Sequence, residues 1–373
     1  MRILSFEIVG LFGREGTISA NLHEDLNILT GRNGSGKTSI LKLLWYVVSG
    51  NILIALREIP FSKITLVTTE YECTVYSLSR STCKIDFATK DGAKSSYEDT
   101  QDEDGDILIN AEDEPNRILR GCGDSVFLPT FRRIEGGFTI GPVNSAFRRV
   151  SQAKSDVEES LLALSKKLSQ NAHTFVSSIS TSDVASLLLR KYSELSDTYT
   201  DIQQTTSQEI ITTIKEFKSD MQDVRQIDAA NKIIDQIRAK VESMEARREE
   251  IMTPIEGVRK MVALLFQHSG IKIGNRLNFG DAANAVNSDT LSAGEKQMLS
   301  FICYNAFNKN SIIFIDEPEL SLHVDWQRQL FSILGQQGSS NQFIIATHSP
   351  FIYSKYPEKE IAIGIDKGDS GKI

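Results

Sequence analysis

Short apolar runs separated by polar turns predict a protein built around a buried sheet. Leu26–Thr30, residues 312–315 and residues 343–346 are mostly apolar, which is typical of parallel strands that are covered on both faces. Residues 38–48 place their apolar side chains at helical spacing. Three further segments predict an antiparallel meander: 63–69, 71–79 and 83–88. The expected fold class is therefore α/β.

The middle of the chain has a different pattern. Residues 145–265 contain almost no glycine, and their apolar residues recur at intervals of three and four, which places them on one side of a helix. The seams are Val157, Leu161, Leu164 and Leu168; Ile210, Ile214, Phe217, Met221 and Val224; and Ile234, Ile237, Val241 and Met244. They predict a helical bundle or a short antiparallel coiled coil inserted between a first lobe (1–144) and a second lobe (266–373).

Composition narrows the class of protein. The chain has 373 residues, 40% of them hydrophobic, and no apolar run approaches membrane-spanning length, so we expect a cytoplasmic protein without a membrane partner. The four cysteines are dispersed and form no C-x-x-C pair, which excludes a zinc hook at the tip of a coiled coil. A net charge of −8 argues against a strongly basic DNA clamp, although a local basic groove stays compatible with it.

One segment concentrates the negative charge. Residues 98–114 hold nine acidic residues and no basic residue. Such a run predicts a solvated hairpin loop, and a docking surface for a basic partner is the alternative.

The segment after the first predicted buried strand fits the phosphate-loop pattern G-x-x-x-x-G-K-[ST]. Because a strand precedes it and a helix follows it, a chance glycine-rich turn is the weaker interpretation. Backbone N–H groups of such a loop surround phosphates, Lys37 would reach the β- and γ-phosphates of ATP, and the Thr38 hydroxyl would bind Mg²⁺. The predicted nucleotide-binding residues are Gly31, Arg32, Asn33, Gly34, Ser35, Gly36, Lys37, Thr38 and Ser39.

Two acids end the strand predicted at 312–315. We expect Asp316 to hold Mg²⁺ and Glu317 to polarise the attacking water, because phosphoryl transfer needs charge neutralisation and positioning. A glutamine or alanine at position 317 would instead have indicated binding without hydrolysis.

Two further segments also carry candidate site residues. Leu291-Ser-Ala-Gly-Glu-Lys-Gln297 opens a predicted helix, and its small residues Ser292 and Gly294 would allow a close approach to a γ-phosphate. An ordinary capping box between Ser292 and Glu295 is also present in this segment. His348 ends the strand predicted at 343–346, where it is either a structural residue or a γ-phosphate sensor.

Along the chain the four segments follow in the order phosphate loop, Leu291–Gln297, two acids, His348. In this order they resemble the ABC-type ATPases of the SMC-like group, which includes the SMC and recombination-repair ATPases, the OLD-like ATPases and short AAA-named relatives from bacterial defence operons. Asp316-Glu-Pro-Glu-Leu-Ser-Leu-His323 is similar to the OLD-like and defence members in particular. The resemblance implies an ATPase head with a parallel or mixed sheet, an antiparallel lobe and a helical insertion. The first lobe would carry the phosphate loop, and the second lobe would carry the other three motifs.

The resemblance also implies a composite site, with ATP and Mg²⁺ held between two heads of a homodimer or a larger oligomer. Each phosphate loop would be completed in trans by the other copy's signature residues: Leu291, Ser292, Ala293, Gly294 and Glu295. His323 would lie in the loop that crosses the interface.

The chain departs from the ABC pattern at two places. His323 stands where ABC proteins carry an aspartate. Residues 125–144 contain no glutamine, so the contact that this lobe usually makes to Mg²⁺ and water has no assigned residue. Arg132 and Arg133 follow in a segment similar to the short subgroup, and they either contact phosphate or a partner or form a solvated basic pair.

The length of the segment after His348 bears on whether the chain carries a nuclease domain. OLD-like proteins continue into a Toprim nuclease domain, but only 25 residues follow His348, too few for a fold of roughly a hundred residues. We therefore expect an ATPase that is not itself a nuclease. The resemblance to the defence ATPases implies that it regulates a separately encoded effector, such as a Toprim-like or HNH nuclease. The trigger would be a nucleic acid or a phage protein, as expected of the PARIS-type and the Septu- and retron-associated ATPases.

A DNA-bound repair or chromosome-maintenance ATPase is the alternative. A transporter's ATPase subunit is disfavoured by Glu295 and by the helical insertion.

Overall fold

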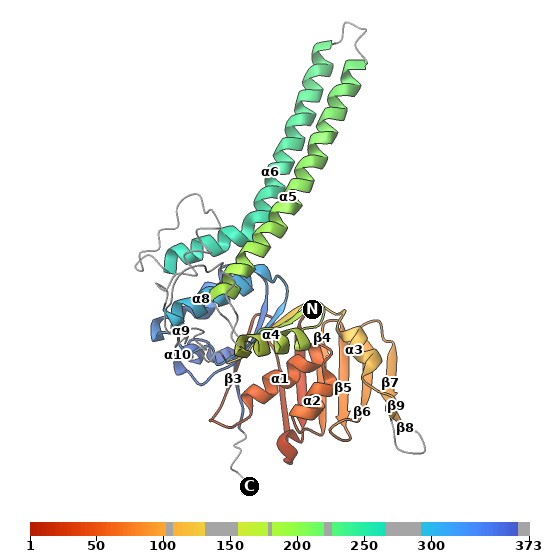
Figure 1. Ribbon diagram of the computed structural model, residues 1–373, viewed down its shortest axis with the longest axis vertical. Helices are drawn as coiled ribbons and strands as arrows, with labels where there is room; N and C mark the ends of the chain where they lie inside the picture. Colours follow the sequence, from red (N-terminus) through yellow and green to blue (C-terminus); the bar gives the residue numbers. More distant parts are fainter. Residues whose placement is uncertain (102–106, 131–155, 178–180, 220–225, 266–291, 365–373) are drawn as a thin grey trace, which may run out of the picture. The chain divides into compact units, whose positions relative to one another are not determined.

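The computed structural model describes residues 1–101, 107–130, 156–177, 181–219, 226–265 and 292–364 (Figure 1). The chain divides into two compact units. The first, called the sheet unit below, comprises Met1–Ile179, Ala293–Met298 and Asn308–Ile373. The second, called the hairpin unit, comprises Ser180–Ser292 and Leu299–Phe307.

A six-stranded parallel sheet forms the centre of the sheet unit, in the order β11-β10-β12-β13-β3-β14. Its strands are β3 (Leu26–Thr30), β10 (Ser125–Leu128), β11 (His173–Phe175), β12 (Ile312–Asp316), β13 (Gln342–Ala346) and β14 (Glu360–Ala362). Every residue of β3, β12 and β13 is buried, which confirms the strands predicted from apolar runs. Because the strands are parallel and in register, the residues that follow β3, β10, β12 and β13 meet at one edge.

A second, antiparallel sheet has the order β2-β1-β4-β5-β6-β7. Its strands are β1 (Ile3–Val9), β2 (Thr17–Asn21), β4 (Lys63–Thr68), β5 (Tyr71–Ser77), β6 (Cys83–Thr89) and β7 (Lys94–Glu98). The meander predicted from 63–69, 71–79 and 83–88 is confirmed as β4, β5 and β6. Strand β4 alternates buried and half-buried positions, as a strand with one face on the core should. The α/β fold class with an antiparallel lobe is confirmed.

The acidic segment forms a small hairpin of β8 (Thr100–Gln101) and β9 (Ile107–Ile109), followed by α3 (Asp113–Leu119). The predicted hairpin is confirmed, although residues 102–106 lie outside the described part. The segment is not wholly solvated, because Glu112 is only 4% exposed. Burial raises the pKa of the Glu112 carboxyl, and the nearby Asp99 and Asp113 carboxylates act in the same direction.

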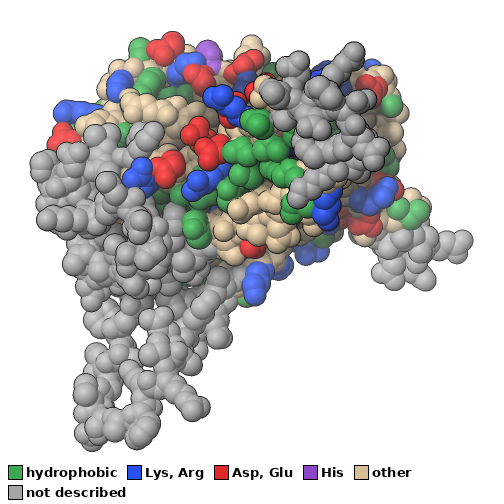
Figure 2. Space-filling model, turned by 90° about the horizontal axis from the view of Figure 1, so that it is seen from above, with side chains coloured by type: hydrophobic (Ala, Val, Ile, Leu, Met, Phe, Trp, Pro, Cys, Tyr) green, Lys and Arg blue, Asp and Glu red, His purple; other side chains and the backbone are tan. Residues whose placement is uncertain are grey.

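On the face seen in Figure 2, Lys and Arg side chains lie among Asp and Glu side chains. Such interspersed charges produce a weaker local field than a cluster of one sign.

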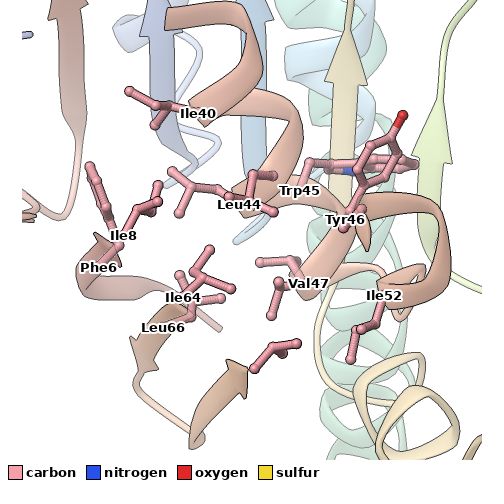
Figure 3. Close-up of a cluster of buried hydrophobic side chains, with 14 of the residues drawn as sticks. Phe6, Ile8, Ile40, Leu44, Trp45, Tyr46, Val47, Ile52, Ile64 and Leu66 are labelled. Carbon is pink, nitrogen blue, oxygen red and sulfur yellow. The ribbon is translucent and has the colours of Figure 1, made fainter. Parts of the chain in front are cut away.

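The hydrophobic core of the sheet unit surrounds α1 (Lys37–Val48) and α2 (Ile52–Glu58). Figure 3 shows side chains of α1 directed toward those of β1 and β4, such as Phe6 and Ile64. Trp45 is fully buried; its ring centroid lies 5.5 Å from that of Phe127, and its indole N–H donates to Ser125 Oγ at 3.1 Å. Burying each large apolar side chain contributes about 1.5–3 kcal/mol, so this core fixes the helix that follows the phosphate loop.

Further described helices belong to the sheet unit. They are η1 (Leu11–Gly13), α4 (Asp156–Leu168), the first turns of α8 (Ala293–Phe307), α9 (Val324–Gly335), α10 (Pro350–Tyr353) and η2 (Pro357–Lys359). Helix α8 confirms the helix predicted after the signature segment.

The hairpin unit contains two long helices, α5 (Thr181–Ser219) and α6 (Gln226–Leu265). They pack side by side with opposite directions, because Glu209 pairs with Lys240 at 3.1 Å and Arg248 lies over the Tyr199 ring at 5.6 Å (Figure 1). At a rise of about 1.5 Å per residue, each helix spans about 60 Å. Of the two predicted forms of the 145–265 segment, residues 181–219 and 226–265 adopt the short antiparallel pair, whereas α4 and β11 of that segment belong to the sheet unit.

The seams of these helices are only partly covered. Ile210 and Ile237 are half-buried, whereas Ile234 is 60% exposed and Ile214 is 39% exposed. Across the described residues, no helix has both the length and the apolar character needed to cross a membrane.

Candidate functional site

The predicted phosphate loop connects β3 to α1 and depends on its glycines. Gly36 has φ 93° and Gly31 has φ 148°, in the region that favours glycine. A Cβ at Gly36 would meet the Phe12 ring at 2.7 Å, and a Cβ at Gly31 would meet the Ile363 carbonyl oxygen at 2.6 Å. Glycine is therefore required at both positions by conformation and by space.

Lys37 begins α1 and is only 4% exposed. Its Nζ donates to the carbonyl oxygens of Gly31 at 2.9 Å and Arg32 at 3.2 Å, so the ammonium group is held within the loop. Desolvation lowers the pKa of Lys37, and the carboxylates of Glu317, Glu319 and Asp316 oppose that shift.

The other predicted loop residues differ in exposure. Arg32, Asn33 and Gly34 are exposed, Ser39 is half-buried, and Ser35 is buried. The Ser35 hydroxyl has no hydrogen-bond partner in the described structure. A buried hydroxyl without a partner is destabilising unless a ligand satisfies it, so this loop fits an oxygen-rich anion such as a phosphate group.

Asp316 ends β12 and is 3% exposed. Oδ1 accepts the Thr38 hydroxyl at 2.9 Å, and Oδ2 accepts the Thr130 hydroxyl at 2.7 Å. Burial raises the pKa of the Asp316 carboxyl, and the two hydrogen bonds oppose the rise. Carboxylate and hydroxyl oxygens are the donors that Mg²⁺ prefers, so these side chains fit that ion.

Thr130 is a residue that sequence reasoning missed. It follows β10, whose neighbour in the sheet is β12, and so lies at the edge where Asp316 lies. The departure noted at residues 125–144 concerned a missing glutamine; the structure instead places a threonine hydroxyl on the Asp316 carboxylate. A hydroxyl two residues after a buried strand was the signal that could have found it.

Glu317 has a positive φ of 49°, which is uncommon for a residue with a side chain. Its backbone N–H donates to the Ala346 carbonyl oxygen at 2.8 Å, which holds this conformation against β13. Burial raises the pKa of the Glu317 carboxyl, with Asp316 and Glu319 adding to the rise and His348 and Lys37 opposing it. A carboxyl with a raised pKa accepts a proton more readily than an ordinary one.

His348 follows β13, and its ring lies between the lysine and the glutamate. Nδ1 is 3.3 Å from Lys37 Nζ, and Nε2 is 3.9 Å from Glu317 Oε1. Because an ammonium group can only donate, Nδ1 accepts and the ring proton of a neutral His348 stays on Nε2. The structure thus brings together predicted residues from three of the four sequence segments: Lys37, Thr38, Asp316, Glu317 and His348.

The fourth segment contacts the loop that follows β12. A Cβ at Gly294 would meet the Ser321 carbonyl oxygen at 2.4 Å, and Gln297 Nε2 donates to the Pro318 carbonyl oxygen at 3.3 Å. The absence of a side chain at Gly294 is therefore required within this chain, a reason that the sequence did not suggest. Ser292 is exposed, and Ala293 and Glu295 are half-buried.

Four predicted residues remain. The His323 side chain is exposed and caps α9, because Nδ1 accepts the Asp325 backbone N–H at 3.4 Å. Leu291 and the basic pair Arg132 and Arg133 lie outside the described residues.

Comparison with known proteins places the chain in a family. Residues 132–354, more than half of the chain, match the family described as "AAA domain, putative AbiEii toxin, Type IV TA system". The chain belongs to this family. The match includes β12, α9 and β13, whereas the phosphate loop precedes it. Membership of this AAA family implies nucleotide binding, usually with Mg²⁺, and indicates an ATPase.

A relative adds a second likeness. Over 86 residues the chain is 30% identical to "Retron Vc95 probable ATPase" of Vibrio cholerae serotype O1 biovar El Tor. This stretch covers 20% of this AAA-family chain and 17% of the relative's length.

Solved structures give weaker likenesses to SMC heads. One is a Pyrococcus furiosus Smc head domain with an extended coiled coil, bound to the C-terminal domain of ScpA. It is 13% identical to this chain with a TM-score of 0.37, and the alignment covers 95% of this chain and 91% of that chain. The SMC head domain of Thermotoga maritima is 13% identical, with a TM-score of 0.36 and coverage of 95% and 92%. At scores this low, nothing about function follows from them.

Proposed function

We propose that this chain hydrolyses ATP at a site shared by two copies of itself and uses the resulting closure to regulate a separately encoded effector. The observation that carries the proposal is the pairing of Thr38 with Asp316 at 2.9 Å, beside Lys37, Glu317 and His348. A hydroxyl after a phosphate loop and an aspartate at a strand end are the groups with which P-loop ATPases hold the metal ion.

The residues of the loop would bind the phosphates. Lys37 would exchange its carbonyl partners for oxygens of the β- and γ-phosphates, where its charge is better compensated. Thr38, Asp316 and Thr130 would supply oxygen ligands or second-sphere contacts for Mg²⁺. When bound, Mg²⁺ would neutralise charge that develops on the phosphates.

Glu317 and His348 would act at the γ-phosphate. The raised pKa of the Glu317 carboxyl suits a group that orients water and accepts its proton. His348, protonated on Nε2, would donate from that atom to a γ-phosphate oxygen. Both side chains are partly exposed, so an incoming nucleotide can reach them.

The signature residues Leu291–Glu295 would complete the partner copy's site, with His323 in the loop that crosses the interface. Support comes from the exposure of Ser292 and from the contact of Gly294 with the loop that also carries Glu317. If α8 moves when it contacts the partner's nucleotide, that movement would shift the loop after β12 and so displace this chain's own Glu317. We propose two lobes, 1–144 and 266–373, around an insertion at 145–265, with the correction that α4 and β11 of this insertion belong to the sheet unit.

The proposed biological setting is anti-phage defence, with PARIS-type and Septu- or retron-associated systems as the nearest comparisons. The short likeness to a retron ATPase supports this setting. The effector would be a Toprim-like or HNH nuclease, and a nucleic acid or a phage protein would be the trigger. Exposed apolar residues of the hairpin unit and the acidic segment are the candidate docking surfaces.

A repair or chromosome-maintenance ATPase that binds DNA directly is the second candidate. The net charge of −8 disfavours it, and on the one face that Figure 2 shows the basic side chains are interspersed with acidic ones. ATP-dependent duplex binding that weakens steeply with salt would favour it.

The shared site is tested by mixing two defective proteins. Ser292→Arg should leave ATP binding nearly intact and block turnover, and Lys37→Ala should lose ATP binding. In a mixed dimer one of the two sites has both an intact loop and an intact signature, so mixing should restore part of the activity. Full ATPase activity of monomeric Ser292→Arg protein would contradict the shared site.

The regulatory role is tested with the purified chain, ATP, Mg²⁺ or Mn²⁺, and plasmid, linear DNA or tRNA. We expect ATP hydrolysis without cleavage of nucleic acid. Metal-dependent cleavage that is retained through purification to homogeneity would refute the proposal that the nuclease is a separate chain.

A further inference from the structure

Glu319 has no role in the proposed reaction, yet both of its carboxylate oxygens contact the segment that carries His348. Oε1 accepts the His348 backbone N–H at 2.7 Å, and Oε2 accepts the Thr347 hydroxyl at 2.8 Å. Hydrogen bonds to a carboxylate are stronger than those between neutral groups, so the end of β13 is firmly attached to the loop after β12.

Gln327 of α9 contacts the same two segments from another side. Its Nε2 donates to the Leu322 carbonyl oxygen at 2.8 Å and to the Glu319 carbonyl oxygen at 3.3 Å. Its Oε1 accepts the Ser349 hydroxyl at 2.6 Å. The Ser349 N–H in turn donates to Thr347 Oγ1 at 3.0 Å, which closes the network.

These four residues, Glu319, Gln327, Thr347 and Ser349, are called the His348 clamp below. They hold the backbone immediately before, at and after His348. The imidazole itself is 32% exposed and contacts the Lys37 ammonium group at 3.3 Å. The clamp fixes the direction in which the side chain leaves the backbone.

We propose that Glu319 and Gln327 are positioning residues that hold His348 between Lys37 and Glu317 for its role at the γ-phosphate. The inference rests on the proposed function, because positioning matters only if His348 takes part in turnover. Glu319 acts through His348 and contacts no reacting atom. Its loss therefore affects the transition state more than the binding of ATP.

A purely structural role for the clamp would have a different signature. Loss of folding would reduce the active fraction and leave the kinetics of the remaining protein unchanged. A purely electrostatic role, through the charge of Glu319 near Lys37, would appear equally in Glu319→Gln and Glu319→Ala. Positioning requires that Glu319→Gln be milder, because its amide keeps one acceptor for the His348 N–H and one donor for Thr347 Oγ1.

The test combines four single variants with a double-mutant cycle. The singles are Glu319→Ala, Glu319→Gln, Gln327→Met and the exposed control Glu72→Ala, and each clamp variant is also made with His348→Ala. In Glu319→Ala we expect kcat for ATP to fall about ten- to a hundredfold with KM changed less than about threefold. Glu319→Gln and Glu72→Ala should stay within about threefold of the wild-type kcat.

The cycle decides whether Glu319 acts through His348. In the His348→Ala background, Glu319→Ala or Gln327→Met should lower kcat by less than about twofold, because the residue that they position is gone. An equal fall of kcat in both backgrounds would overturn the proposal. So would a rise in KM with kcat unchanged.

A readout that does not need activity separates this inference from the proposed function. The protein has five histidines, and the ¹³Cε1–H signal of His348 is assigned by its loss in His348→Ala. Glu319→Ala should shift or broaden that signal, and Glu72→Ala should not. If the wild-type protein hydrolysed no ATP, the proposed function would fail. The NMR comparison would still test whether Glu319 and Gln327 position His348. An unchanged His348 signal in both Glu319→Ala and Gln327→Met would refute it.

Discussion

The sheet unit and the hairpin unit use polar residues in opposite ways. Asp316 of the sheet unit is 3% exposed and receives hydrogen bonds from two hydroxyls on separate segments. Glu209 of the hairpin unit has a side chain that is 56% exposed, and it pairs with Lys240, whose side chain is 35% exposed. The first carboxylate is removed from water and depends on its partners, whereas the second stays hydrated.

This difference shows in which unit the loss of a single hydrogen-bonding atom should affect stability and activity most. A buried polar group without its partner destabilises the protein by the full desolvation cost, while an exposed ion pair contributes little. Substitutions of matched chemistry in the two units should therefore have very unequal effects.

The largest contrast is between two lysines. Lys37→Ala should abolish ATP binding, because it removes the buried ammonium group of the phosphate loop. Lys240→Ala should leave ATP binding unchanged. Titration with a fluorescent ATP analogue measures both. Equal affinities in Lys37→Ala and wild-type protein would show that the loop does not bind phosphate.

A second contrast separates binding from turnover. Glu317→Gln should bind ATP like the wild type and lose about 10²- to 10⁴-fold in turnover, the range for removal of a general base. Glu209→Gln, in the hairpin unit, is the matched control and should hydrolyse ATP normally. Phosphate release under saturating ATP is the measurement, and wild-type turnover in Glu317→Gln would show that another group orients the water.

Packing gives the third contrast. Leu44 is fully buried in the sheet unit, and Leu44→Ala should lower the free energy of unfolding by about 2–5 kcal/mol. Ile234 is 60% exposed, and Ile234→Ala should cost about 0.5 kcal/mol or less. Urea unfolding followed by tryptophan fluorescence and circular dichroism checks both. Comparable losses would mean that Ile234 is covered by another copy or segment in solution.

A fourth contrast uses pH. Burial raises the pKa of Glu112, so the folded protein keeps this proton at pH values where the unfolded chain has released it. Stability therefore falls as pH rises from the ordinary pKa of 4.5 through the higher folded value. Glu112→Gln should raise the Tm at neutral pH, and the difference should vanish below pH 4. Glu209→Gln should show no such pH-dependent gain. A neutral-pH Tm below that of the wild type would mean that charged Glu112 has a stabilising partner.

The smallest effect belongs to the hairpin unit's ion pair. A double-mutant cycle of Glu209→Ala and Lys240→Ala should give a coupling of about 0.2–1 kcal/mol that decreases with salt. A coupling well above this range would indicate that the pair is buried in an assembly.

Local patterns predicted much of the sheet unit correctly. Apolar runs located β3, β12 and β13, and alternation located β4 to β6, because burial on one or both faces selects residue types directly. The glycines predicted a tight loop before α1 for the same reason, since its conformation tolerates few other residues; that this loop binds phosphate stays a prediction. The exact partners of the hairpin helices and the burial of Glu112 had no local signal.

Sequence by itself determined several buried strands, the meander and the long helices, and it named the candidate site residues: a predicted phosphate loop, two acids at a strand end and a histidine at another. Only the tertiary structure decided which of these residues touch. Thr130 and Asp316 are 186 positions apart, and the order of β10 and β12 in the sheet brings them together. Glu319 likewise meets the His348 backbone because β12 and β13 are neighbours. Strand order depends on packing of the whole chain, which no short pattern of residues encodes.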